Sequence, residues 1–90
     1  MFLFEEIKEL ISDNKLELEI SKLNAVIEAN PQNDEAYLLR GHAYRKQENW
    51  KRALSDYATA HNINPAGDAA IAYESTVEIL NFYNTDLYNP

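Results

Sequence analysis

Apolar side chains recur every three or four residues along most of the chain, which is the spacing of amphipathic helices. The pattern predicts five helices, over residues 2–12, 16–29, 34–46, 50–62 and 69–83. We expect Asp13-Asn14 to separate the first two. Pro31 should stop the second, because a proline disfavours helical geometry in the residue before it. No alternating strand pattern occurs, and the connections are short, so the sequence predicts an all-α fold with antiparallel neighbours.

Polar residues stand where these helices should begin. Asn33 or Asp34 can accept the first free amides of the third helix, and Asn49 can do the same for the fourth. Gly67-Asp68 opens the fifth helix. These residues therefore predict where the last three helices begin.

A period of 34 residues runs through the chain. Pro31 and Pro65 are 34 positions apart, and each follows an asparagine at an expected helix end. This period is typical of helix-turn-helix repeats. Within one period, small residues alternate with aromatic ones at fixed spacing, at Tyr37, Gly41, Tyr44, Ala53, Tyr57, Ala60 and Pro65.

Residues 34–67, which carry this spacing, closely resemble a tetratricopeptide repeat (TPR), with Arg40 in place of the leucine usual in that family. Residues 1–33 resemble a degenerate copy, because Ile7 and Glu19 stand where the family has small residues at the helix crossing.

The end of the chain resembles the beginning of a third repeat. Residues 68–83 match its first helix and would cap the domain, and residues 84–90 form a tail. The resemblance implies one domain, an α-α superhelix of two TPR-like antiparallel helix pairs plus a C-terminal capping helix.

The small residues have a steric explanation. Gly41 inside a helix costs about 1 kcal/mol relative to alanine, so something must compensate for it. A bare backbone at Gly41, with Ala53 opposite, would let two helices approach to roughly 8–9 Å. We therefore expect the closest contact of the middle helix pair at these two residues.

Composition and charge argue against several classes of protein. The net charge is −7, which disfavours binding to the phosphate backbone of nucleic acids. No apolar run approaches the roughly 20 residues of a membrane span, and no basic stretch precedes Glu5 as in a signal peptide. The absence of cysteine excludes disulfides and thiolate metal sites. We expect a cytoplasmic protein that binds no membrane.

Catalytic chemistry finds no support in the sequence. His42 and His61 are the only histidines, and neither has an acid or a second histidine one turn away in a metal-binding pattern. There is no glycine-rich phosphate loop and no nucleophile elbow. We expect neither an enzyme nor a bound cofactor or metal.

The TPR resemblance implies that a partner binds in an inner groove lined by the first helix of each repeat. Carried over to this sequence, the partner-binding residues are Phe4, Lys8, Ile11, Leu38, His42, Arg45, Lys46, Ala72, Thr76 and Ile79. The centre of this set is basic and its ends are apolar. It suggests a protein or peptide ligand with an acidic residue between apolar anchors, and an adaptor or scaffold role. Arg45 and Lys46 have a simpler explanation too, since cations in the last turn of a helix favour its dipole.

Residues 69–83 leave a second question open, because apolar side chains cover an arc of roughly 240° of this helix. A capping helix should have a polar outer face. Either the tail, with Leu87 and Tyr88, covers the apolar surface, or the surface binds a partner. The alternatives to an adaptor are therefore a small chaperone that masks an apolar client segment and a structural homodimer formed through this helix.

Overall fold

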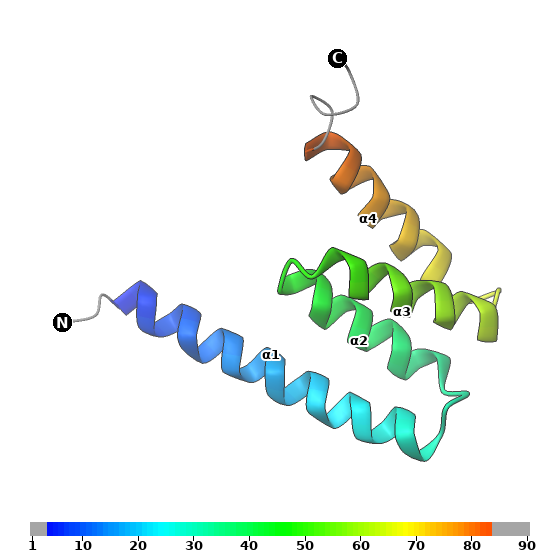
Figure 1. Cartoon of the computed structure of the whole chain (residues 1–90), viewed down its shortest axis with the longest axis horizontal. Coiled ribbons are helices and arrows are strands. Elements are labelled where there is room, and N and C mark those ends of the chain that lie inside the picture. Colours follow the sequence, from blue (N-terminus) through cyan, green and yellow to red (C-terminus); the bar gives the residue numbers. More distant parts are fainter. Residues whose placement is uncertain (1–3, 84–90) are drawn as a thin grey trace.

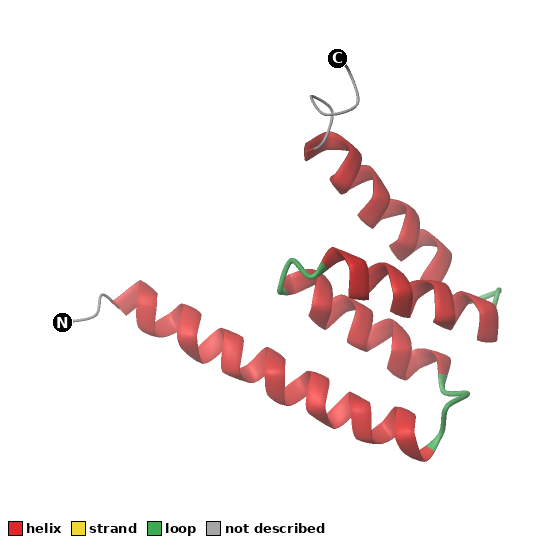
Figure 2. Ribbon diagram, in the orientation of Figure 1, coloured by secondary structure: helices red, strands yellow, loops and turns green. Residues whose placement is uncertain are grey.

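The chain folds into four helices joined by short turns. The computed structural model describes the backbone of residues 4–83 and the side chains of residues 14–82. The helices are α1 (Phe4–Ala29), α2 (Asp34–Lys46), α3 (Trp50–Ile63) and α4 (Ala69–Tyr83). Figure 2 shows no strand in the described part of the chain, so the all-α prediction is confirmed.

The helices stack in chain order, and each runs roughly opposite to the one before it (Figure 1). α2 lies between α1 and α3, and α4 packs on the other side of α3. The 26-residue α1 is twice as long as the 13-residue α2, so its first half extends beyond the hairpin that α2 and α3 form. α1 and α4 therefore form the two ends of the stack.

The predicted break at Asp13-Asn14 is wrong, because α1 is continuous from Phe4 to Ala29. Neither residue is a strong helix breaker, since aspartate and asparagine cost at most about 0.7 kcal/mol relative to alanine inside a helix. A turn there would also have to bring Ile7 and Glu19 together, and these are large where close helix crossings need small residues. One long helix thus replaces the first predicted helix pair.

The α2–α3 hairpin has a close contact at Gly41, as expected, but the residue that lies against Gly41 is Tyr57 and not Ala53. Gly41 is buried, and Ala53 and Tyr57 are both 0% exposed. A Cβ atom on Gly41 would lie 2.6 Å from Cε1 of Tyr57, closer than carbon atoms normally approach. Glycine is needed because the tyrosine ring lies directly against the α2 backbone.

The observed helix starts match the predicted caps. The Asn33 side chain accepts a hydrogen bond from the Ala36 amide at 3.1 Å, and Asn49 accepts one from the Arg52 amide at 3.4 Å. Between α2 and α3, Glu48 has a φ of 61°, in the left-handed region that side chains other than glycine rarely adopt. The hairpin turn is therefore held by tertiary packing and caps, because its sequence does not favour that conformation.

Candidate partner-binding site

The predicted site is centred on a histidine that contacts the hairpin core. Nδ1 of His42 on α2 lies 2.7 Å from the hydroxyl oxygen of Tyr57 on α3, and the two rings meet edge to face at 5.4 Å. The hydrogen bond gives the buried Tyr57 hydroxyl a partner, which a buried polar group needs. His42 itself stays half-buried. It therefore connects the core to the surface of α2.

Two cations follow His42 on the last turn of α2. Arg45 is half-buried and Lys46 is exposed. Burial, followed by the charges of Arg45 and Lys46, lowers the pKa of His42 below its usual range. Burial also raises the pKa of Tyr57, an effect that the Arg45 guanidinium partly offsets. At neutral pH the surface thus offers two permanent cations beside a neutral imidazole.

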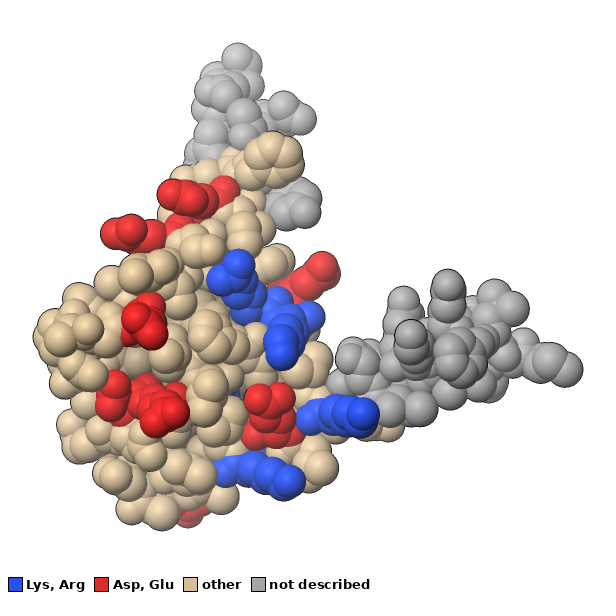
Figure 3. Space-filling view, turned by 180° about the vertical axis from the view of Figure 1, so that it is seen from behind, with Lys and Arg blue, Asp and Glu red and all other residues tan. Residues whose placement is uncertain are grey.

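On the face shown in Figure 3, lysine and arginine side chains lie near one another with some acidic side chains among them, and further acidic side chains lie over α4 and on the far side from the cations. Four of the eight cations flank the α2–α3 turn, namely Arg45, Lys46, Lys51 and Arg52. An anionic group would be attracted to this end of the hairpin.

The structure brings together only part of the predicted residue set. Leu38 lies beside His42 on α2 and packs, partly buried, against the core around Tyr57. Ile79 on α4 is also half-buried. The side chains of Phe4, Lys8 and Ile11 lie outside the described residues. The described centre of the site therefore comes from α2.

Two predicted positions on α4 need correction. Thr76 is 0% exposed, and its hydroxyl donates a hydrogen bond to the Ala72 carbonyl at 2.8 Å. Ala72 is 9% exposed and packs with Ala53 and Tyr57. Both residues are therefore buried, and Ala72 is small enough to pack against the Tyr57 cluster of α3. Their expected place on an open groove is wrong, whereas binding by the exposed members of the set stays a prediction.

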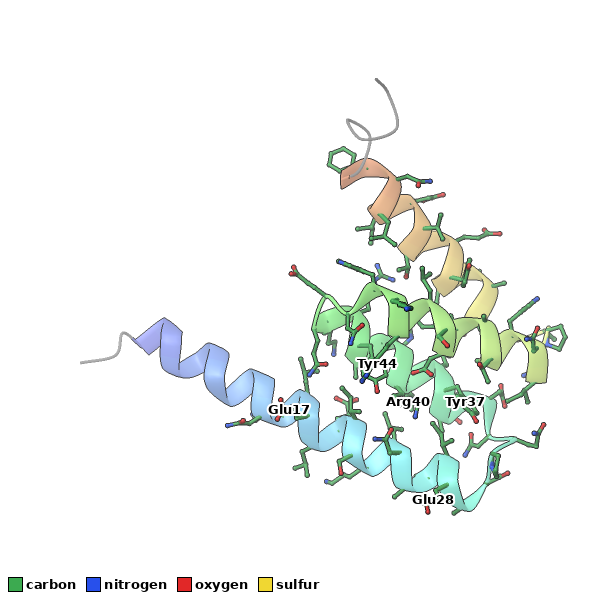
Figure 4. All side chains as sticks on the ribbon, in the orientation of Figure 1. Glu17, Glu28, Tyr37, Arg40 and Tyr44 are labelled. Carbon is green, nitrogen blue, oxygen red and sulfur yellow. The ribbon has the colours of Figure 1, made fainter. Side chains whose placement is uncertain are left out.

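The sequence analysis missed an ion pair that joins three helices. The Arg40 guanidinium donates to both Asp56 carboxylate oxygens, at 2.8 and 2.7 Å, and to the Asn24 side-chain oxygen of α1 at 2.9 Å. Tyr37 and Tyr44 flank it, with ring centroids 5.5 and 5.9 Å from its central carbon (Figure 4). In the sequence, Arg40 stands out only as a departure from the TPR pattern. The signal for the ion pair was the positive charge of Arg40 together with the acid Asp56, 16 positions later.

A hollow of about 360 Å³ borders this ion pair. Because three N–H groups of Arg40 donate to Asp56 and Asn24 on two other helices, the pair acts as a structural clamp. A second hollow, of about 290 Å³, lies between α3 and α4 and is lined by Tyr57, Ala58, His61, Asn62, Ala70, Tyr73 and Glu74. In the described part of the chain, Nδ1 of His61 is a buried atom without a hydrogen-bond partner.

Among the residues that the structure describes, no group of three or more histidine, cysteine, aspartate or glutamate side chains is placed to hold a metal ion. No helix in this part of the chain has the length and apolar character needed to span a membrane.

The fold defines an all-α protein of stacked antiparallel helices with a basic surface at one hairpin turn. No family model matches the chain, and no curated protein matches it. It is similar to Bacteroides fragilis protein BF1650, whose structure was solved in solution by NMR, with 40% sequence identity and a TM-score of 0.71. The similarity covers 99% of this chain and 91% of that one. The chain therefore belongs to the same family as BF1650.

Proposed function

We propose that this protein is a non-catalytic interaction module, an adaptor or scaffold, that binds another protein through the exposed surface of α2. The observation that supports this best is the cluster of Arg45, Lys46 and His42 next to the apolar Leu38. These cations stand on a chain whose net charge is −7. Such a surface is complementary to an extended or helical peptide with an acidic residue between apolar anchors. The TPR resemblance of residues 34–67 and the absence of cysteine are in keeping with this role in the cytoplasm.

Charge reversal tests the proposal directly. A peptide library with a fixed acidic residue between two apolar residues should be enriched by the wild-type protein. It should not be enriched by Arg45→Glu/Lys46→Glu, because the cations that attract the acid are gone. A second library with lysine in place of the acid controls for apolar binding.

The matched control is Lys15→Glu/Lys22→Glu, which makes the same change of charge on exposed residues of α1, away from the α2–α3 turn. This control should keep the selectivity for acidic peptides. Equal enrichment by the wild type and by the Arg45/Lys46 variant would refute the proposed site. Binding of apolar peptides without regard to the acidic residue would instead support the alternative of a chaperone for apolar segments.

A further inference from the structure

The two ends of the helix stack carry apolar and charged side chains that no described helix covers. On α1, Leu18 is 56% exposed and Val26 is 41% exposed, and Lys22 is exposed on the same side of the helix. On α4, Ile71 is 69% exposed, and Glu74 and Glu78 are exposed beside it. On α1 the aliphatic side chains thus stand with Lys22 and, one turn before it, the exposed Glu19, whereas on α4 they stand with two glutamates.

The 34-residue period relates these two ends to the α2–α3 hairpin. Residues 16–29 of α1 lie 34 positions before α3, and α4 lies about 34 positions after α2. In these terms α4 corresponds to the first helix of a repeat, and it is the last helix among the described residues. The end of α1 is a second helix whose first helix has not folded back on it, because α1 is continuous.

The same period maps the Arg40–Asp56 ion pair onto these ends. Glu74 lies 34 positions after Arg40, and Lys22 lies 34 positions before Asp56. Both are exposed, and the Arg40–Asp56 pair is the only ion pair among the described residues. Glu74 and Lys22 again have opposite charges. Here the acid is on α4, which corresponds to the first helix of a repeat, and the base is on α1, which corresponds to the second.

The surface next to Glu74 has room for aliphatic side chains. The hollow of about 290 Å³ between α3 and α4 and a neighbouring one of about 250 Å³ share Tyr73 and Glu74 in their walls. Ala58 and Ala70 line the first, and Val77 lines the second. Side chains of the size of Leu18 and Val26 fit such spaces.

We propose that α1 of one copy docks on α4 of a second copy, with Lys22 facing Glu74 and the aliphatic side chains Leu18 and Val26 against the hollows beside Glu74. The contact would cover both exposed ends of the helix stack. Such a contact joins different surfaces of the two partners, so further copies can add end to end and the assembly grows with concentration. The acidic-peptide surface on α2 is not involved, so this inference stands independently of the proposed function.

A charge swap tests this contact. Sedimentation velocity of the wild-type protein should show a mass that rises with concentration. The single variants Glu74→Lys and Lys22→Glu should each remain monomeric, because each places like charges opposite one another. An equimolar mixture of the two should associate again, since the acid of one variant then meets the base of the other. Added salt should weaken the wild-type assembly.

The controls are Glu28→Lys on α1 and Lys51→Glu on α3, which make the same charge changes on exposed residues away from the proposed contact (Figure 4 labels Glu28). Both should associate like the wild type. Circular dichroism of each variant checks that it folds. A wild-type monomer at all concentrations would overturn the proposal, as would single variants that still associate. A chain that associates only after removal of residues 84–90 would also overturn it, in favour of the tail as the cover of α4.

Discussion

The α2–α3 hairpin and the long helix α1 come from sequences that share a 34-residue period, yet one folds back on itself and the other does not. In the hairpin, Gly41 and Ala53 allow the Tyr57 ring to lie against the α2 backbone. In the first period, Ile7 and Glu19 stand at the two small positions. The comparison teaches that the hydrophobic pattern sets the helices, whereas small residues at the crossing decide whether two helices become a hairpin.

The turns of the two regions differ as well. The turn after α2 is entered through Glu48 in a left-handed conformation and leads to the Asn49 cap. Such a conformation costs on the order of 1–3 kcal/mol for a residue other than glycine, and hairpin packing must compensate for it. At residues 13–14 the chain instead continues as α1, where aspartate and asparagine cost at most about 0.7 kcal/mol relative to alanine.

The largest expected effect is loss of the clamp that holds the hairpin to α1. Asp56→Ala leaves the Arg40 guanidinium, whose side chain is 20% exposed, without its carboxylate. Removing one partner of such an ion pair should lower the free energy of unfolding by about 3 kcal/mol. Chemical denaturation measures this loss.

A double substitution separates the clamp from simple packing. Arg40→Leu/Asp56→Leu, with leucine at position 40 as the TPR resemblance implies, should recover most of the lost stability, because well-packed apolar residues often replace buried ion pairs without cost. A loss below about 1 kcal/mol in Asp56→Ala would match an ordinary surface pair and contradict the clamp.

The second-largest expected effect is a loss of stability on substitution of Gly41, the residue at the close contact between α2 and α3. Gly41→Ala gains about 1 kcal/mol of helix propensity, but its Cβ would meet the fully buried Tyr57 ring, and overpacking costs about 1–3 kcal/mol. We expect a net loss of about 1 kcal/mol, seen as a melting temperature lowered by about 4–8 °C. Gly67→Ala is the control, since its Cβ would lie 3.3 Å from Nδ2 and 3.5 Å from the backbone oxygen of Asn64, both longer than the contact at Gly41. A Gly41→Ala variant as stable as the wild type would show that the ring can move aside.

Sequence reasoning placed three of the four helices well for identifiable reasons. Asn33, Asn49 and Pro65 are local signals whose physics is complete within a few residues, so α2 and α3 begin where expected. The burial of Thr76 and the Arg40–Asp56 pair depend on how helices rotate against one another. No local pattern records that rotation, so the α4 part of the site could not be predicted.

A smaller, stabilising effect is expected from a substitution that tests whether α1 is continuous through residues 13–14. Asn14 is exposed within α1, and alanine there should raise the free energy of unfolding by about 0.5 kcal/mol if the helix is continuous. If residues 13–14 formed a turn, the same change would remove a turn-favouring residue and lower the stability. Ser21→Ala is the control, because residue 21 is exposed and helical in both arrangements and should be stabilised either way.

The smallest effect is a pH dependence that belongs to the hairpin alone. Burial and the neighbouring cations lower the pKa of His42 in the folded protein, so folding favours the neutral imidazole. The unfolded chain then binds more protons, and stability is lost as the pH falls from the usual histidine value of 6.5 through the lowered folded value. The half-buried position of His42 keeps the loss modest. Denaturation at several pH values should show a drop below pH 6.5 that is absent in His42→Gln. An equal drop in both proteins would show that other groups cause the loss of stability, and would contradict a lowered pKa of His42 in the folded protein.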